Sequence, residues 1–445
     1  MQDALRESIR EHIRRNGEDI TLRHLMVRER PIFYGWWVVA SCTLVSVWGG
    51  GIFYSFTAFV NPVVEEFGWT YFLVSLAAAL RSVEMGAMAP VMGFLVDKFG
   101  PRRVVFASGL LTGAGFFLLS RTSSLATFYL SFFVLSVGWS GTGQVTTTTA
   151  VASWFRNRIG LATGIVVAGY GIGGALVPII TWLIEQHGWQ TSLVVLAGAT
   201  ALIIPLASLA LRHHPEQYGY LPDGEHRNIQ SKKTATLSSQ PEAEYTVKLA
   251  LAARAFWIIS VAYMIQFTIT NAVTLHIMPY LASVSVPRET ASVVAMLIPI
   301  LSVIGRLSFG WLGDVFGQKY LLAISFLLQS LGLAFLYTAR DDSQIALFLI
   351  LFGPAIGGSL VLRPAIIRRQ FGRRSFGSIQ GLVVAIMTVG GIIGPALAGW
   401  VFDVTGSYGI AWVTFAVLTT AAAVIILTVK GTKAAARAIS KVEQE

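Results

Sequence analysis

Arg306 stands inside a long apolar run, and its guanidinium group is suited to binding an anion. It precedes Asp314 by eight positions, or about 12 Å along a helix, which is near the middle of a bilayer if the run crosses one. An arginine at that depth costs about 3 kcal/mol, so it needs polar surroundings and a partner. Guanidinium groups grip carboxylates through two parallel hydrogen bonds. The residue therefore predicts a carboxylate-binding site, with a permanent salt bridge between helices as the alternative.

Other polar side chains recur at helical spacing in the apolar runs. Ser302 lies one turn before Arg306 on the same face. A single polar residue of this kind more often forms a hydrogen bond between helices than a contact to a solute. Further stripes hold Tyr54, Thr57 and Asn61 in and just after residues 35–60, Gln144 in 125–153, and Gln266 and Thr270 in 254–281.

Two residues inside the apolar runs could carry a proton, Glu84 and His276. Arg81 and Glu84 are three positions apart and can pair on one helix face; we favour a structural pair over titration of Glu84. His276 does not share the stripe of Gln266 and Thr270, so a histidine with satisfied hydrogen bonds is an equal alternative to a proton carrier. Arg363 is interpreted as a side chain that extends to the inner surface, with a gate contact as the alternative.

Enzymatic chemistry has no signature in the sequence. It contains no phosphate-binding loop with lysine and serine or threonine, and no histidine cluster of zinc type. Cys42 is the single cysteine, which excludes an intramolecular disulfide and a cysteine-based metal site. We therefore expect a protein that is not an enzyme and that binds neither a cofactor nor a metal.

The composition indicates an all-α membrane protein. Of 445 residues, 54% are apolar and 13% charged, whereas soluble domains carry about 25% charged residues. A helix needs about 20 apolar residues to cross a bilayer, and no strand-like alternation suggests a barrel. Twelve runs meet this requirement: 35–60, 70–96, 104–120, 125–153, 159–184, 190–211, 254–281, 290–313, 320–338, 344–367, 376–402 and 408–429.

An internal repeat divides these runs into two sets of six. GFLVDKFGPRR at 93–103 recurs as GWLGDVFGQKY at 310–320, and the same offset of 217 residues relates 164–178 to 381–395. We therefore predict two pseudo-symmetric six-helix bundles, 33–211 and 253–430, with tails 1–32 and 431–445 and a linker at 212–252. The repeated motif contains Gly93, Asp97, Gly100, Arg102 and Arg103 in the first copy, and Gly310, Asp314, Gly317 and Lys319 in the second.

Lysine and arginine are concentrated in the loops after the second, fourth, eighth and tenth runs, and in 212–252. The positive-inside rule then places both termini and the linker in the cytoplasm. The net charge of +10 follows mostly from this topology, so we expect a lipid bilayer as partner and no nucleic acid. Residues 1–32 predict a short amphipathic helix or a disordered tail, and the polar linker is expected to be flexible.

The repeated motif resembles the loop between the second and third helices of the major facilitator superfamily, and this resemblance spans the chain. It implies that the first, fourth, seventh and tenth helices line the transport path, and we expect the substrate contacts on the first, fourth and seventh. It also implies that the motif latches the outward-open state. The aspartates would then hold basic residues and neighbouring helix ends together. A surface ion pair that only sets topology is the alternative.

FYGWWVVAS at 33–41, TAVASWFRNRIGLATGI at 149–165 and YGYLPDG at 218–224 resemble the monocarboxylate transporter and oxalate/formate antiporter branch. This resemblance implies a small organic anion as substrate and gives Arg306 the role of the eighth-helix arginine. The first run lacks the lysine of several relatives, Ser302 replaces their aspartate, and 376–402 lacks the second base of oxalate exchangers. A single midplane cation outside the Arg81–Glu84 pair suits a monoanion.

Together these observations predict a multi-pass transporter of the cell (inner or plasma) membrane. We expect it to carry monocarboxylates such as lactate or pyruvate by alternating access, with a proton as co-substrate. The alternatives are antiport of other small carboxylates and efflux of larger amphipathic compounds.

Overall fold

The computed structural model describes residues 33–218, 220–224, 245–339 and 341–429, and every described element is helical. The predicted all-α fold is confirmed for these residues. The predicted amphipathic helix at the N-terminus, the centre of the linker and the C-terminal tail lie outside the described part of the chain.

The first half of the chain forms helices because its apolar runs are long and bounded by turn residues. The fourth predicted run divides at Gly143 into two helices, and a short 3-10 turn, Gly174–Leu176, interrupts the fifth. A break at Gly188, with φ of 78°, separates the last two runs within one long helix. The elements are α2 (Gly35–Phe67), α3 (Tyr71–Phe99), α4 (Pro101–Ser120), α5 (Leu125–Thr142), α6 (Gln144–Trp154), α7 (Ile159–Gly173) and α8 (Val177–Leu209).

The second half repeats this pattern. A short helix, α10 (Val247–Ala252), precedes the first long one. The tenth predicted run continues past residue 367 to Phe371, which places Arg368 inside a helix rather than in a loop. The long elements are α11 (Arg254–Ser283), α12 (Arg288–Phe316), α13 (Gln318–Tyr337), α14 (Asp342–Phe371), α15 (Phe376–Thr405) and α16 (Gly409–Leu427).

Within the described residues, ten stretches are long and apolar enough to cross a membrane. One of them, Ile159–Leu209, holds both the fifth and the sixth predicted runs. The 29 residues of α3 span about 44 Å, which also exceeds a bilayer core of about 30 Å. Many large apolar side chains are exposed, such as Leu130 at 66% and Trp400 at 63%, as expected for surfaces that face lipid.

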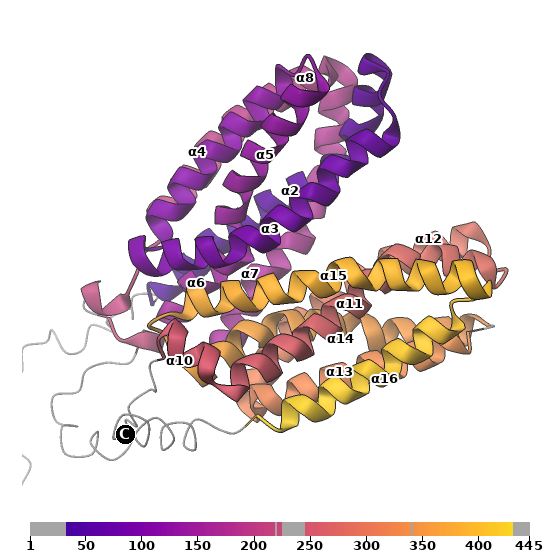
Figure 1. Ribbon diagram of the computed structural model, residues 1–445. Helices are drawn as coiled ribbons and strands as arrows, with labels where there is room; N and C mark the ends of the chain where they lie inside the picture. The colour runs from indigo at the N-terminus through magenta and orange to yellow at the C-terminus, as the bar shows by residue number, and fades with distance from the viewer. Residues whose placement is uncertain (1–32, 219, 225–244, 340, 430–445) are drawn as a thin grey trace, which may run out of the picture. The chain divides into compact units, whose positions relative to one another are not determined.

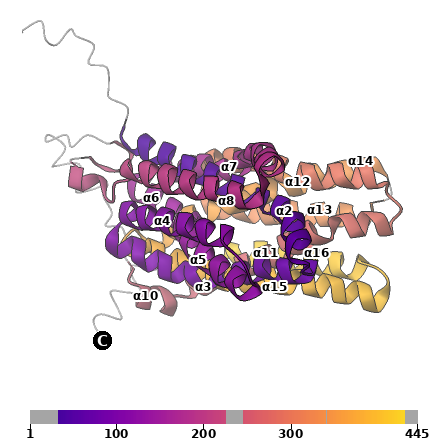
Figure 2. The same ribbon diagram turned by 90° about the horizontal axis from the view of Figure 1, so that it is seen from above.

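Each half has its own apolar core, and two helix pairs make the most extensive contacts between the halves. In the first half α4 packs on α5 and α8, and α2 on α7; in the second, α11 packs on α15, α12 on α14, and α13 on α14 and α16. Across the halves, α3 contacts α15 and α7 contacts α12. Figure 1 shows the indigo-to-magenta first half meeting the orange-to-yellow second half along α6, α7 and α15, and Figure 2 shows the long helices running alongside one another.

The two copies of the repeated motif form equivalent tight turns. Gly100 joins α3 to α4 with φ of 82°, and Gly317 joins α12 to α13 with φ of 93°. Side chains other than glycine rarely adopt this conformation, which explains the glycine in both copies. The end of the helices that carries these two turns is called the motif end below, and the opposite end is called the far end.

Candidate functional site

Two adjoining cavities lie between the halves. The larger, of about 350 Å³, is lined by α2, α3, α5, α6, α11, α14 and α15, and includes Arg363; the smaller, of about 230 Å³, includes Arg306. Phe53, Met85 and Gln144 line both, so the cavities are neighbours. Apart from the two arginines, the lining is neutral: its described residues include no aspartate, glutamate, lysine or histidine.

Arg306 is placed in the smaller cavity by close contact between α12 and α7. A side-chain carbon at Gly164 would lie 2.6 Å from the Arg306 carbonyl oxygen, so only glycine permits this approach. The Arg306 side chain is 8% exposed, and its Nη1 donates to the Val167 carbonyl at 2.9 Å. Its Nε is buried without a hydrogen-bond partner, and no described acidic side chain contacts it. The protein therefore leaves this charge unneutralised.

Arg363 is a second buried cation, 1% exposed, on the wall of the larger cavity. Its Nη2 donates to Gln144 Oε1 at 2.8 Å and its Nη1 points to Met387 Sδ at 3.0 Å, while its Nε has no partner. The interpretation as a side chain that extends to the membrane surface is wrong, because α14 continues beyond it and Arg363 turns to the other half. The structure thus adds a cation that the sequence analysis did not count.

Gln144 connects the two arginine positions. It is the first residue of α6, directly after the break at Gly143. Because a guanidinium only donates, the amide oxygen must face Arg363, and the amide nitrogen then points away. That nitrogen is buried without a partner. Three buried donors at the cavities therefore lack acceptors: Arg306 Nε, Arg363 Nε and Gln144 Nε2.

Of the other predicted contact residues whose side chains are described, one lines the cavities and three do not. Tyr54 lines the Arg306 cavity. The Ser302 hydroxyl donates to the Pro299 carbonyl of its own helix at 2.7 Å. Gln266 donates to Thr270 at 2.8 Å, and the face of α11 that lines the larger cavity carries instead Phe267 and Asn271. The side chains of Thr57 and Asn61 lie outside the described part.

Neither proton-carrier candidate lines the two cavities. The structure gives no ion pair between Arg81 and Glu84, both of which are described; the Arg81 guanidinium lies over the Phe53 ring at 4.8 Å, and Glu84 Oε1 is buried without a partner. The expected structural pair is therefore absent. His276 is held at both nitrogens, by the Tyr408 hydroxyl at 3.1 Å and by the Pro395 carbonyl at 3.0 Å.

At the motif end, the two repeated aspartates each cap a helix of the other half. Asp97 accepts from the Gly377 and Ser378 amides at 2.9 and 2.8 Å and from the Ser378 hydroxyl at 2.7 Å, in the first turn of α15. Asp314 accepts from the Gly160 and Leu161 amides at 2.8 and 2.9 Å, in the first turn of α7. A carboxylate at a helix N-terminus interacts favourably with the unpaired amides and the helix dipole.

The repeated glycines serve the same contacts. A side-chain carbon at Gly93 would overlap the Gly377 carbonyl, and one at Gly310 would lie 2.6 Å from the Gly160 carbonyl oxygen. The basic residues of the motif do not join the aspartates: Arg102 and Arg103 are exposed in the first turn of α4. Lys319 donates to the Leu427 and Val429 carbonyls near the end of α16.

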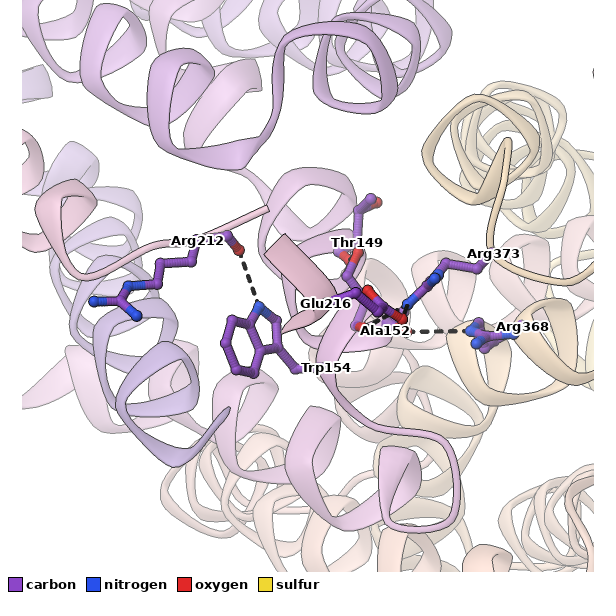
Figure 3. Close-up of polar contacts among 8 residues, drawn as sticks. Thr149, Ala152, Trp154, Arg212, Glu216, Arg368 and Arg373 are labelled. Atoms are coloured by element: carbon purple, nitrogen blue, oxygen red, sulfur yellow. Dashed lines mark hydrogen bonds and ion pairs between the residues drawn. The ribbon is translucent and has the colours of Figure 1, made fainter. Parts of the chain in front are cut away.

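Further contacts join the halves beside these caps (Figure 3). In α14, Arg368 Nε donates to the Ala152 carbonyl at 3.1 Å. Beyond it, Arg373 forms an ion pair of 2.7 Å with Glu216 and donates to the Ser153 carbonyl at 3.4 Å.

The start of the linker packs onto the motif end. Trp154 Nε1 donates to the Arg212 carbonyl at 3.0 Å, and Asp223 accepts from the Arg156 and Asn157 amides. Residues 212–218 and 220–224 of the predicted linker therefore contact the helices at the motif end, and the flexibility of the linker stays a prediction. Burial, and next the neighbouring charges of His213 and Arg373, lower the pKa of His214 to about 4, against its ordinary 6.5.

Comparisons with known proteins agree with this fold. The family model described as Major Facilitator Superfamily matches residues 39–308 and 255–444. Monocarboxylate transporter 13 of Rattus norvegicus is 27% identical over 399 residues, covering 89% of each chain. Monocarboxylate transporter 12 of Mus musculus is 25% identical over 403 residues, covering 84% of this chain and 81% of that one.

Solved structures show the same fold at low identity. The proton:xylose symporter XylE superposes with a TM-score of 0.70 at 14% identity, covering 90% of this chain and 96% of that one. The human organic anion transporter MFSD10 superposes with a TM-score of 0.67 at 12% identity, covering 88% of this chain and 99% of that one.

Proposed function

The chain belongs to the Major Facilitator Superfamily, and from that premise we propose that it transports small organic anions, such as the monocarboxylates lactate and pyruvate. In this proposal Arg306 binds the substrate carboxylate. Family and relatives are transporters and not enzymes, so a transport cycle rather than a chemical reaction is the activity to explain.

One observation carries the proposal: Arg306 faces a cavity with an unpartnered Nε and no described acid beside it. A buried guanidinium of this kind is stabilised when an anion arrives, because the ligand supplies both the missing acceptor and the missing negative charge. The relatives named monocarboxylate transporters, which match most of the chain, support the same substrate class.

The transport cycle follows from the contacts at the motif end. We place that end in the cytoplasm, because the basic residues of the motif lie there. In the described residues, the hydrogen bonds at Asp97, Asp314 and Arg368 join the halves on this side. The conformation is then closed to the cytoplasm, and rocking of the halves must break these bonds to expose the cavity there.

Proton coupling falls more naturally on Glu84 than on His276. Both His276 nitrogens already have partners, whereas a buried carboxylate oxygen of Glu84 has none. A protonated carboxyl is less costly to bury than a charged one, so Glu84 can take up a proton at its position in α3. Substitution of Glu84 by glutamine would then uncouple anion uptake from the proton gradient, whereas proton-driven accumulation that persists in this variant contradicts the assignment.

The decisive experiment is uptake of labelled lactate into proteoliposomes. We expect Arg306→Ala to abolish uptake and Arg306→Lys to retain a fraction, since a lysine keeps the charge without the planar fork. Arg121→Ala is the matched control, because Arg121 is exposed and lies over the Phe117 ring of its own helix. Equal uptake by the parent and Arg306→Ala would remove the carboxylate assignment.

Efflux of larger amphipathic compounds is the second candidate, favoured by the size and apolar lining of the larger cavity. Cavities of about 300–1,000 Å³ accommodate drug-sized ligands. Extrusion of an uncharged amphipathic dye from loaded proteoliposomes, without any carboxylate flux, would replace the anion proposal by this one.

A further inference from the structure

We infer that Arg363 and Gln144 form a second anion-binding subsite next to Arg306, and that the preferred substrate is a short dicarboxylate held between the two arginines. The inference rests on the proposed function, since it assumes that Arg306 binds one carboxylate. It differs from the sequence-based expectation of a monoanion, which counted a single midplane cation.

Charge is the first argument. The described lining of the two cavities contains Arg306 and Arg363 and no acidic side chain. A monoanion that binds Arg306 would leave Arg363 without a counter-charge in an enclosed space. A dianion neutralises both arginines, and each desolvated charge then has a partner.

Unsatisfied donors are the second argument. Arg363 is 1% exposed, yet its Nε has no acceptor, and the Nε2 of Gln144 beside it has none either. Buried donors in proteins nearly always have partners, so two such donors at one cavity wall indicate a missing acceptor. A carboxylate offers two oxygens with free lone pairs and can accept from both groups while the Arg363–Gln144 bond persists.

Spacing is the third argument. A side-chain carbon at Gly357 would overlap the Ser302 carbonyl and lie 2.9 Å from the Arg306 amide nitrogen, so Gly357 of α14 is level with the turn of α12 that runs from Ser302 to Arg306. Arg363 follows Gly357 by six residues, which is about 9 Å further toward the motif end. Side chains on both helices lean toward their own N-termini, so the offset carries over to the guanidinium groups. One small anion with two carboxylates can lie between them.

The subsite also connects substrate binding to the rocking of the halves. Gln144 belongs to the first half and Arg363 to the second, and they are joined by one hydrogen bond of 2.8 Å. A carboxylate that accepts from both bridges the halves near the motif end. The alternative is that Arg363 and Gln144 are a permanent link between the halves that never contacts substrate.

The test compares diacids with monoacids of matched length, succinate with butyrate and malonate with propionate, as competitors of labelled lactate uptake in proteoliposomes. For the parent protein we expect the diacid of each pair to compete about tenfold better or more. Arg363→Gln should lower this ratio by about tenfold, Arg363→Lys by less, and the exposed-residue control Arg121→Gln should leave it unchanged.

Three results would overturn the inference. In the first, lactate uptake depends on Arg306 but monoacids compete as well as diacids; the proposed function then survives and the second subsite does not. In the second, Arg363→Gln weakens competition by both acids equally, as a permanent link would. Loss of all carboxylate transport in the parent refutes the proposed function itself. Stabilisation by succinate in thermal unfolding of the purified Arg363→Gln protein, matching that of the parent, would also contradict the subsite and does not require transport.

Discussion

Replacing Asp97 by asparagine should open the motif end. Asp97 accepts three hydrogen bonds from the first turn of α15. An amide keeps one acceptor oxygen, which can retain the two Ser378 bonds, and its NH₂ group then faces the Gly377 amide, so that bond and the negative charge are lost. Hydrogen bonds to charged groups contribute about 1.5–3 kcal/mol each, and the helix dipole adds a further increment. Because this carboxylate is half-buried, we expect the substitution to destabilise the closed conformation by about 2–4 kcal/mol relative to an open one.

A shift of 2 kcal/mol changes a two-state population by about thirty-fold. The solvent accessibility of residue 153 can report the opening of the motif end. Ser153 is 5% exposed, and its carbonyl accepts a hydrogen bond from Arg373 of the other half. Cys42 is the single cysteine of the chain, so Cys42→Ala with Ser153→Cys gives one reporter thiol. Its rate of reaction with a water-soluble maleimide in detergent solution should rise about thirty-fold or more when Asp97→Asn is added.

Asp341→Asn provides the matched control. Asp341 caps the first turn of α14 by accepting from the Gln344 amide at 3.0 Å, but this contact is within the second half. Its loss weakens one helix end without separating the halves. Equal labelling rates in the Asp97→Asn and Asp341→Asn proteins would refute the reasoning that the carboxylate of the motif holds the halves together.

Three further outcomes can be measured with the same reporter. Gly160→Ala should speed labelling and lower the unfolding temperature, because its side-chain carbon would overlap α12 at a cost of about 1–3 kcal/mol, whereas Gly198→Ala, with nothing within 4 Å, should change neither. His214 has a pKa of about 4 here and an ordinary pKa of 6.5, so the closed state binds fewer protons than an open one, and protonation favours opening. The labelling rate of the reporter thiol at position 153, divided by that of a free thiol at the same pH, should therefore rise as the pH falls from about 6.5 toward 4. The substitution His214→Gln should flatten this rise. Glu216→Gln should increase labelling by less than about fivefold, because its ion pair with Arg373 is partly exposed and contributes less than about 1 kcal/mol; a larger increase would show that this pair is a main closing contact.

The helices could be predicted from the sequence because a bilayer imposes a length and an apolar composition on each crossing. Helix ends are harder to predict than helices: the apolar run in the sequence ends at residue 367, whereas α14 continues to Phe371. This continuation changes the interpretation of Arg363 from a surface group to a cavity group. The boundaries of the two bundles stay a prediction. The repeat of Asp97 and Asp314 was readable from the sequence, but their partners in α15 and α7 are not local and follow only from the packing of the halves.

The cavity residues illustrate a second limit. The polar stripe of Gln266 and Thr270 predicts that these residues face the cavity, yet they bond to each other, and the lining face is one position later, at Phe267 and Asn271. One residue corresponds to a rotation of about 100° about the helix axis. Because α11 carries polar groups on two faces, the sequence alone does not determine which face lines the cavity. Buried donors without acceptors, such as Nε of Arg363, have no signature in a sequence and require coordinates.

The reciprocal placement of the two aspartates has a consequence for how the halves recognise each other. The first half supplies the acceptor for α15, and the second half supplies the acceptor for α7, so each fragment carries one member of both pairs. Assembly of the halves therefore does not require a continuous backbone. Two separately encoded fragments, divided between Gly224 and Tyr245 and co-expressed, should associate in the membrane and co-purify, and fragments that bear Asp97→Asn and Asp314→Asn together should not.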